Sequence, residues 1–224
     1  MKTPTRRPTA LVFDLDGTLI DSRRDIATAV NRMRGEQGLP PLALEQVVGM
    51  VGEGARVLVV RALGGGEIAE ERLGAALASY LAHYEEVCLD DTHAYPGVPE
   101  MLGDLAEVYP LAVLSNKGEA VSKRILEALG LAPRFRIILG GDSLPIRKPD
   151  PAGLRLLAKR LGVQVEELML IGDSRIDAET ARAASCQFAL VEWGFPRRSS
   201  LEGIPADLRG KEPIEITTAL LAVR

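Results

Sequence analysis

Cysteine and histidine are scarce in this sequence of 224 residues, which contains only Cys88, Cys186, His83 and His93. None of the four has neighbours at the spacing of a zinc site or a redox-active pair. We therefore expect the cysteines to be small buried hydrophobic residues, and the histidines to lie at the surface or at helix ends.

Long hydrophobic runs and an excess of positive charge are also missing. The first apolar run is interrupted by Asp14 and Asp16, so it does not form a secretory signal, and no stretch approaches the length of a membrane-spanning helix. The formal net charge of −4 provides no attraction for nucleic acid or an anionic membrane. We expect a soluble cytoplasmic protein with neither kind of partner.

The apolar residues that are present make up 46% of the chain, enough to bury a full core in one domain with a small insertion. Short apolar segments bounded by Gly, Asn or Asp predict strands buried on both faces of a parallel sheet. They occupy residues 9–15, 111–115, 136–140, 168–172 and 188–193. Helical spacings alternate with them from residue 98 onward, and a last helix is predicted at 214–223. This alternation predicts an α/β fold with a doubly wound, Rossmann-like parallel sheet.

Residues 21–92 break the alternation, because they carry only helical patterns. These patterns occupy residues 26–33, 44–48, 55–63 and 73–84. Ser22 followed by Asp25 resembles a capping arrangement for the first helix. The segment is predicted to be a small helical cap inserted after the first strand, over the carboxyl edge of the sheet, while residues 1–20 and 93–224 form the α/β core.

Two carboxylates, those of Asp14 and Asp16, lie where the first strand ends and the chain reaches Gly17. Ligands of open α/β sheets bind beyond this end of the strands. Two neighbouring acids repel each other unless a cation or a shared proton intervenes. The pair indicates a carboxylate nucleophile beside a carboxyl that transfers protons, with a hard divalent metal between them. Asp and Gly are also common turn residues, so the pair alone leaves a simple polar turn open.

Polar residues follow the next two strands as well. Ser115 and Asn116 offer a hydroxyl and an amide beside the start of a helix, where an anion can bind, although serine is also a common N-cap. Lys148 precedes a helix that Asp150 is expected to cap and Pro151 to begin. That position allows one ammonium group to reach a phosphate or a carboxylate, although a lysine in a loop is more often a solvated charge.

The strand at 168–172 is followed by two further acids, Asp173 and Asp177. Asp173 is placed to provide a third oxygen ligand for a magnesium ion shared with Asp14, and Asp177 to orient Lys148 or a metal-bound water. Helix capping by acidic residues is the alternative for these two. Four strand ends that all carry the residue types of an anion and magnesium site together favour such a site.

In their order along the chain, these runs resemble the four motifs of the haloacid dehalogenase superfamily. The runs are residues 14–18, 115–117, 148–149 and 172–177. The helical insert resembles that superfamily's cap of the first type, and residues 51–56 resemble the cap loop of phosphoglycolate phosphatases. The second motif has serine where threonine is frequent and Gly118 where proline is frequent, and neither difference changes the chemistry.

The resemblance implies a magnesium-dependent phosphatase. Asp14 would be the nucleophile that forms an aspartyl-phosphate, and Asp16 the acid that protonates the leaving oxygen and then activates water. Asp14, Asp173 and the Asp16 carbonyl would hold Mg²⁺, while Ser115 and Lys148 would grip the phosphoryl group. The other residues expected at the site are Thr18, Asn116, Gly52, Glu53, Gly54 and Arg56 for substrate, and Gly17, Gly172, Ser174 and Asp177 in support.

The cap loop and Arg56 favour 2-phosphoglycolate as substrate, although a solvated helix residue is an equal alternative for Arg56. A small phosphorylated metabolite is the only expected partner, and a monomer or homodimer is the expected state. Phosphoglucomutases and pyrophosphatases share the same core and remain alternatives. Asp16 disfavours a dehalogenase, and the absence of lysine from residues 21–92 disfavours a phosphonate hydrolase. A phospho-accepting signalling module is the alternative from another class, and the insert and Asp16 count against it. Trp193 is expected to pack in the core.

Overall fold

Two compact units make up the structure, a computed structural model that describes residues 7–195 and 201–222. One unit comprises the described residues up to Asp21 and from Ala94 onward, and the other comprises Ser22–His93. The first unit contains the large sheet, and the second is helical. No helix among the described residues is long and apolar enough to cross a membrane.

The sheet of the first unit has six parallel strands in the order β5-β4-β1-β6-β7-β8. The strands are β1 (Ala10–Phe13), β4 (Leu111–Leu114), β5 (Ile137–Leu139), β6 (Leu168–Gly172), β7 (Gln187–Val191) and β8 (Leu208–Gly210). The first strand is central, with Val12 opposite Ala112 on one side and Leu170 on the other. The predicted α/β class with a parallel sheet is confirmed. The sequence analysis missed β8, because its three residues include an exposed arginine and form no apolar run.

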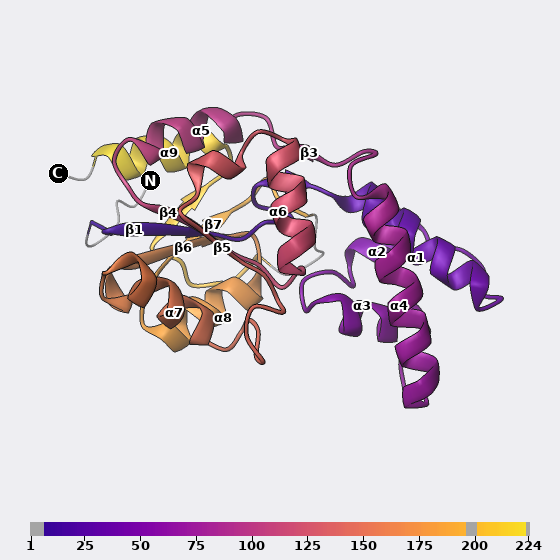
Figure 1. Cartoon of the computed structure of the whole chain (residues 1–224). Coiled ribbons are helices and arrows are strands. Elements are labelled where there is room, and N and C mark those ends of the chain that lie inside the picture. The colour runs from indigo at the N-terminus through magenta and orange to yellow at the C-terminus, as the bar shows by residue number, and fades with distance from the viewer. Residues whose placement is uncertain (1–6, 196–200, 223–224) are drawn as a thin grey trace. The chain divides into compact units, whose positions relative to one another are not determined.

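Helices cover both faces of this sheet, with α5 and α9 on one face and α7 and α8 on the other (Figure 1). The helices of this unit are α5 (Val98–Ala106), α6 (Glu119–Ala128), α7 (Ala152–Leu161), α8 (Arg175–Ala184) and α9 (Pro213–Ala222), with short 3-10 turns η1 (Ala132–Arg134) and η2 (Val165–Glu167). Alternate strand residues point to opposite faces, so both sides of the strands are apolar. Val12 and Leu170 pack with Leu154 and Leu157 of α7. Val223, the expected last residue of α9, lies outside the described residues.

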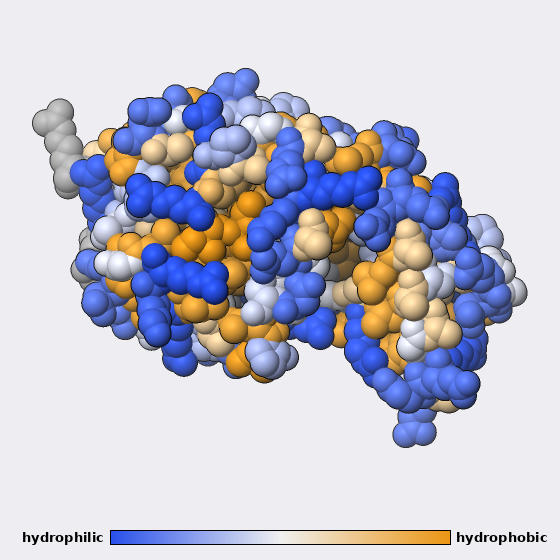
Figure 2. All heavy atoms as spheres, in the orientation of Figure 1, coloured by the Kyte–Doolittle hydropathy of each residue, from blue (hydrophilic) through white to orange (hydrophobic). Residues whose placement is uncertain are grey.

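The second unit contains α1 (Arg23–Glu36), α2 (Leu44–Val48), α3 (Ala55–Ala62) and α4 (Glu70–Val87). The longest two, α1 and α4, pack against each other. The short strands β2 (Ile20–Asp21) and β3 (His93–Ala94) form a separate two-stranded sheet. Figure 2 shows hydrophilic residues interspersed with apolar ones over the visible face of the first unit.

Asp25 does not act in the capping arrangement that the sequence suggested. Ser22 occupies the N-cap position of α1, but its side chain makes no capping hydrogen bond. The buried Asp25 carboxylate instead accepts hydrogen bonds from the backbone N–H groups of Asp91 (3.0 Å) and Thr92 (2.8 Å) and from the Thr92 hydroxyl (2.7 Å). A carboxylate with several donors is stable in a buried position, so Asp25 ties the start of this unit to its end.

Candidate active site

Parallel strands bring the polar residues that follow them to one edge of the sheet. The Asp14 N–H donates to the Ile171 carbonyl (2.9 Å), so Asp14 continues the pairing of β1 with β6. The Ser115 N–H donates to the Leu139 carbonyl (3.0 Å) and extends the pairing of β4 with β5 in the same way. The side chains of Asp14 and Ser115 therefore start from neighbouring, well-defined backbone positions.

A buried ion-pair cluster lies at this edge. Lys148 Nζ is 2.8 Å from Asp14 Oδ1 and 2.7 Å from Asp177 Oδ1. The lysine is 4% exposed and Asp177 is fully buried, so each charge in the cluster depends on the others for its solvation. The structure thus brings Asp14 together with two residues that lie more than 100 positions later in the sequence.

Asn116 holds the backbone of Lys148 with both ends of its amide. Asn116 Nδ2 donates to the Lys148 carbonyl, and the Lys148 N–H donates to Asn116 Oδ1, each at 3.0 Å. The sequence analysis predicted a substrate contact for Asn116, which stays a prediction. The observed bonds make Asn116 a support for Lys148.

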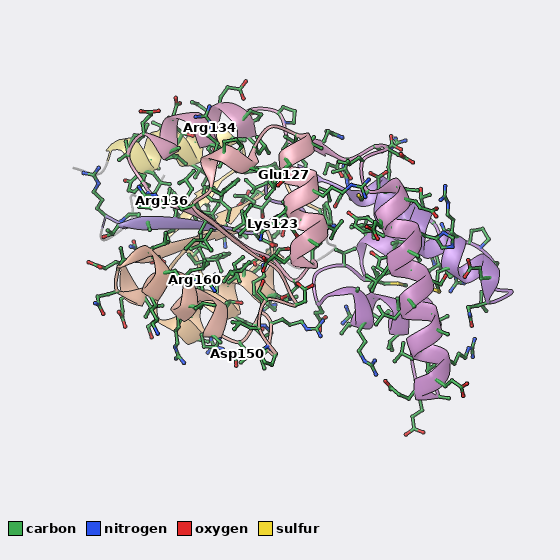
Figure 3. All side chains as sticks on the ribbon, viewed as in Figure 1. Lys123, Glu127, Arg134, Arg136, Asp150 and Arg160 are labelled. Atoms are coloured by element: carbon green, nitrogen blue, oxygen red, sulfur yellow. The ribbon has the colours of Figure 1, made fainter. Side chains whose placement is uncertain are left out.

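The loop that carries Lys148 leads into α7 through Asp150 (Figure 3). Asp150 Oδ1 accepts a hydrogen bond from the Ala152 N–H (2.8 Å), but Pro151 occupies the N-cap position that the sequence assigned to Asp150. The helix begins at Ala152, one residue later than predicted, and Pro151 precedes it. A one-residue difference of this kind is common at helix ends.

Ser115 is not the N-cap of the helix that follows it, so that interpretation is wrong. The helix α6 begins at Glu119 after Gly118, and Asp142 Oδ1 accepts the hydrogen bond of the Glu119 N–H (2.7 Å). The buried Ser115 hydroxyl instead accepts from the Lys117 N–H at 3.3 Å.

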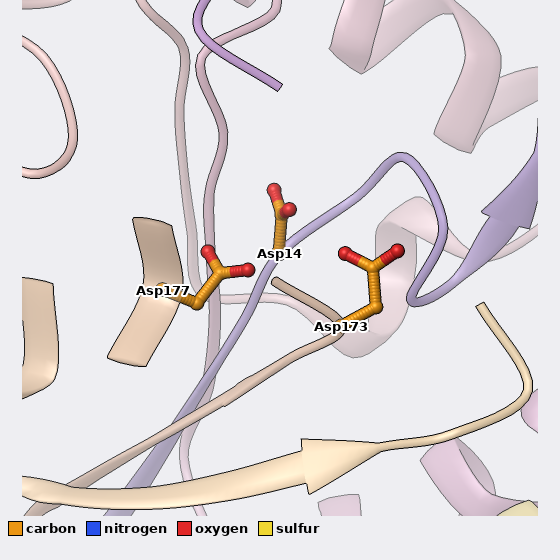
Figure 4. A group of neighbouring side chains, drawn as sticks. All are labelled: Asp14, Asp173 and Asp177. Atoms are coloured by element: carbon orange, nitrogen blue, oxygen red, sulfur yellow. The ribbon is translucent and has the colours of Figure 1, made fainter. Parts of the chain in front are cut away.

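Three carboxylates converge at the strand ends: those of Asp14, Asp173 and Asp177 (Figure 4). Each offers one oxygen, and these oxygens all lie within 4.8 Å of one another, close enough to share one cation. Lys148 and Ser174 already bind the two oxygens of Asp177, which also closes the capping box of α8. Asp14 and Asp173 therefore fit a hard divalent cation better than Asp177 does.

Two glycines make room for these acids. A Cβ on Gly17, which has φ of +84°, would lie 2.2 Å from Asp173 Oδ2. A Cβ on Gly172 would lie 2.5 Å from Asp177 Cγ. Both positions therefore exclude any side chain while the carboxylates keep these places.

Burial raises the pKa of Asp14 from 3.8 to about 6, against the opposing effect of Lys148, while the charge of Asp177 adds to the rise. Burial lowers the pKa of Lys148, but the two carboxylates outweigh it and the pKa is raised above its ordinary value. At neutral pH Asp14 is mostly ionised and Lys148 is charged. The cluster thus offers a buried carboxylate that is able to act as a nucleophile.

Asp16 has a partner that the sequence analysis did not single out. Lys117 Nζ lies 2.9 Å from Asp16 Oδ1, and the two side chains are 7% and 13% exposed. Lys117 follows Ser115 and Asn116 directly on the loop after β4, and this adjacency is the only signal that the sequence contains for its role. The first motif therefore contacts a second ammonium group in addition to that of Lys148.

Thr18 and Trp193 also meet at this edge. Trp193 Nε1 donates to the Thr18 carbonyl at 3.0 Å. The Thr18 hydroxyl is buried and has no hydrogen-bond partner among the residues that the structure describes. Trp193 thus makes a specific contact with the first motif, where the sequence predicted packing alone.

The substrate residues predicted in the helical unit make contacts with other residues of the same unit. Arg56 Nη2 binds the Glu70 carboxylate at 2.7 and 2.8 Å, with both side chains largely exposed. Glu53 pairs with Arg61. Gly54 is the N-cap of α3 and has φ of +89°, and Gly52 has φ of +122°. Arg56 and Glu53 are therefore both engaged in ion pairs with neighbours in this unit.

Comparison with known proteins gives one family. The family model for haloacid dehalogenase-like hydrolases matches residues 11–191. The chain is 42% identical over 197 residues to a phosphoglycolate phosphatase of Rhodospirillum rubrum, covering 85% of this chain and 82% of that protein. It is 41% identical to phosphoglycolate phosphatase 1 of Pseudomonas aeruginosa, covering 85% and 72%. The crystal structure of a predicted phosphoglycolate phosphatase from Haemophilus somnus superimposes with a TM-score of 0.88 at 29% identity, over 96% of this chain and 98% of that one.

Proposed function

The chain belongs to the haloacid dehalogenase-like hydrolase family, and from this membership and the geometry of its strand ends we propose that it is a magnesium-dependent phosphatase acting on 2-phosphoglycolate. The observation that carries the proposal is the buried contact of Lys148 with Asp14, with Asp173 at the same edge. The relatives named as phosphoglycolate phosphatases, at 41–42% identity, support the substrate.

In the first half of the reaction, an Asp14 carboxylate oxygen attacks the phosphorus atom, and the bond from phosphorus to the ester oxygen breaks. Asp16 donates a proton to that oxygen, because an alkoxide is a poor leaving group at neutral pH. In the second half, Asp16 takes a proton from water, which attacks the aspartyl-phosphate and restores the Asp14 carboxylate. Inorganic phosphate and the alcohol are the products.

Charge neutralisation is what the rest of the site contributes. A phosphate dianion repels a carboxylate nucleophile, and the ammonium group of Lys148 offsets this repulsion at a distance of 2.8 Å from Asp14. Ser115 donates its hydroxyl to a phosphoryl oxygen. Mg²⁺, held by Asp14, Asp173 and the Asp16 carbonyl, would neutralise further charge on the transferred group.

We assign the helical unit Ser22–His93 the role of a cap that excludes water from the reaction and selects the substrate. Its loop of Gly52, Glu53 and Gly54, followed by Arg56, is the segment we assign to the carboxylate of 2-phosphoglycolate. The ion pair between Arg56 and Glu70 would open when Arg56 turns to the substrate. Exposed ion pairs of this kind are weak, because water screens the two charges, so Arg56 can exchange Glu70 for the substrate.

The proposal is tested by measuring kcat/KM for 2-phosphoglycolate, glucose phosphates and pyrophosphate, each with Mg²⁺ and with excess chelator. We expect 2-phosphoglycolate to be the best substrate and chelation to abolish its hydrolysis. A clear preference for pyrophosphate would indicate a pyrophosphatase, and interconversion of glucose phosphates would indicate a phosphoglucomutase. A protein that retains a phosphoryl label without turnover would instead be a signalling module.

Magnesium binding is expected to weaken as the pH falls below about 6. The cation binds the ionised Asp14 carboxylate, whose pKa is raised to about 6 by burial. Below that pH the proton competes, and the affinity should fall by up to about 10-fold per pH unit, with proton release on binding. Isothermal titration calorimetry between pH 5 and 8, in two buffers with different heats of ionisation, measures both quantities. An affinity that is constant over this range would contradict the raised pKa.

Substitution of Lys117 is expected to affect substrates with poor leaving groups most. In Lys117→Met, Asp16 loses an ion pair that helps to hold its carboxyl group in place for proton donation. We therefore expect kcat for an alkyl phosphate to fall by about 10-fold or more. Hydrolysis of p-nitrophenyl phosphate, whose leaving group needs little protonation, should fall less. Lys123→Met, which removes an exposed pair with Glu119 on α6 (Figure 3), is the matched control. Equal losses for both substrates would show that Lys117 does not act through Asp16.

A further inference from the structure

The segment 193–195, which follows β7, contacts both loops that carry the acids of the site. The Phe195 N–H donates to Asp173 Oδ2 at 3.1 Å, and the Phe195 side chain is 2% exposed. Two residues earlier, Trp193 Nε1 donates to the Thr18 carbonyl at 3.0 Å. One short segment thus binds the carboxylate of Asp173 and the turn that follows Asp14.

Gly194 lies against the same groups. A Cβ at this position would be 2.4 Å from the Gly17 carbonyl oxygen, 2.5 Å from Asp173 Cβ and 2.6 Å from Asp173 Oδ2. A Cβ on Gly17, in the first motif, would lie 2.2 Å from the same Asp173 Oδ2. No side chain fits between the segment and the two loops, so the close approach requires glycine on both sides of Asp173.

We propose that the segment 193–195 is a positioning element for the metal site. The Phe195 N–H fixes one oxygen of Asp173 and thereby the orientation of the whole carboxylate, while Trp193 fixes the turn at Thr18 relative to it. Gly194 lets the segment come close enough to do both. The proposal rests on the proposed function only in taking Mg²⁺ as the ion that Asp14 and Asp173 hold.

Positioning of a ligand from outside the coordination shell affects metal affinity more directly than it affects folding. Loss of such a contact typically weakens metal binding by about 10- to 100-fold. Trp193 is the only tryptophan of the chain, so its intrinsic fluorescence reports on this segment alone. Because Trp193 is hydrogen-bonded to the first motif, we expect that fluorescence to change when a cation binds at Asp14 and Asp173.

The decisive variant is Gly194→Ala, with Gly103→Ala as its control. Gly103 lies within α5, where the nearest atom to an added Cβ is 4.0 Å away, so the control adds the same methyl group without a collision. Metal-free full-length proteins are titrated with Mg²⁺ and followed by tryptophan fluorescence, without substrate. We expect saturable binding by the wild type and by Gly103→Ala, and binding at least about 10-fold weaker by Gly194→Ala.

A second variant keeps the inference testable if Gly194→Ala does not fold. Trp193→Phe keeps an aromatic ring and removes the donor to Thr18, and its Mg²⁺ affinity is measured by calorimetry. We expect it to bind at least about threefold more weakly than wild type. Wild-type Mg²⁺ affinity in Gly194→Ala, or in Trp193→Phe if only that variant folds, overturns the positioning role while the proposed phosphatase stands. A wild-type protein that binds no Mg²⁺ refutes the metal of the proposed function and this inference with it.

Discussion

Replacement of Asp14 by asparagine is expected to abolish phosphatase turnover, with a loss of at least about 10⁴-fold in kcat, while the protein remains folded. The amide has nearly the shape of the carboxylate but is a very poor nucleophile, so no aspartyl-phosphate forms. Folding should persist because Lys148 retains its contact with Asp177 at 2.7 Å. Removal of Asp14 also removes a carboxylate whose ionisation is disfavoured by burial.

Two measurements separate loss of chemistry from loss of structure. Turnover of 2-phosphoglycolate is followed for Asp14→Asn and for Asp104→Asn, an exposed aspartate on α5 that should keep full activity. Circular dichroism and thermal unfolding should then be close to wild type for both variants. Normal activity in Asp14→Asn would disprove the nucleophile assignment.

Replacement of Lys148 by methionine is expected to lower both activity and stability. The variant leaves Asp14 and Asp177 buried together with no cation between them, and loss of one partner from a buried ion pair costs about 3–5 kcal/mol in the free energy of unfolding. Turnover should also fall by at least about 10³-fold, since the transferred phosphoryl group loses its neutralising ammonium.

The pH dependence of the free energy of unfolding distinguishes the loss of the Lys148 charge from a packing defect. Burial raises the pKa of Asp14 and Lys148 opposes that rise, so protonation of Asp14 in the folded state is favoured further without the lysine. Urea unfolding should therefore show the variant recovering part of the lost stability between pH 7 and pH 5. Lys123→Met, which loses only a largely exposed pair, should change the free energy of unfolding by less than about 1 kcal/mol. A stability deficit in Lys148→Met that stays constant with pH would point to packing instead.

The sequence was sufficient to predict the features that follow from strand periodicity and topology. Asp14 and Asp173 each come directly after an apolar run, and parallel strands place the ends of such runs at one edge. The predicted α/β class followed from the same alternation. Lys148 was predicted as one of two groups that Asp177 would orient, the other being a metal-bound water, and the structure places Lys148 and Asp177 2.7 Å apart.

Contacts between loops were not predictable in this way, because no local pattern states which loops touch. The pairing of Lys117 with Asp16, the bonds from Asn116 to the Lys148 backbone and the binding of Asp173 by the Phe195 N–H all join separate segments. The capping roles predicted for Ser115 and Asp25 were wrong for a related reason. Both residue types are common caps, but at each position another partner in the fold competes with the helix N–H groups.

The central place of β1 has a consequence for the order in which the protein is made. Residues 10–13 are translated before both of their neighbours in the sheet, which are β4 and β6 at 111–114 and 168–172. The first strand is therefore unpaired on one edge until β4 has been translated, and on the other edge until β6 has been translated. The contiguous segment Ser22–His93 contains its own internal contacts and emerges long before that point. We expect it to gain structure first during translation, and the half-made core to be the stage at which this chain depends most on chaperones.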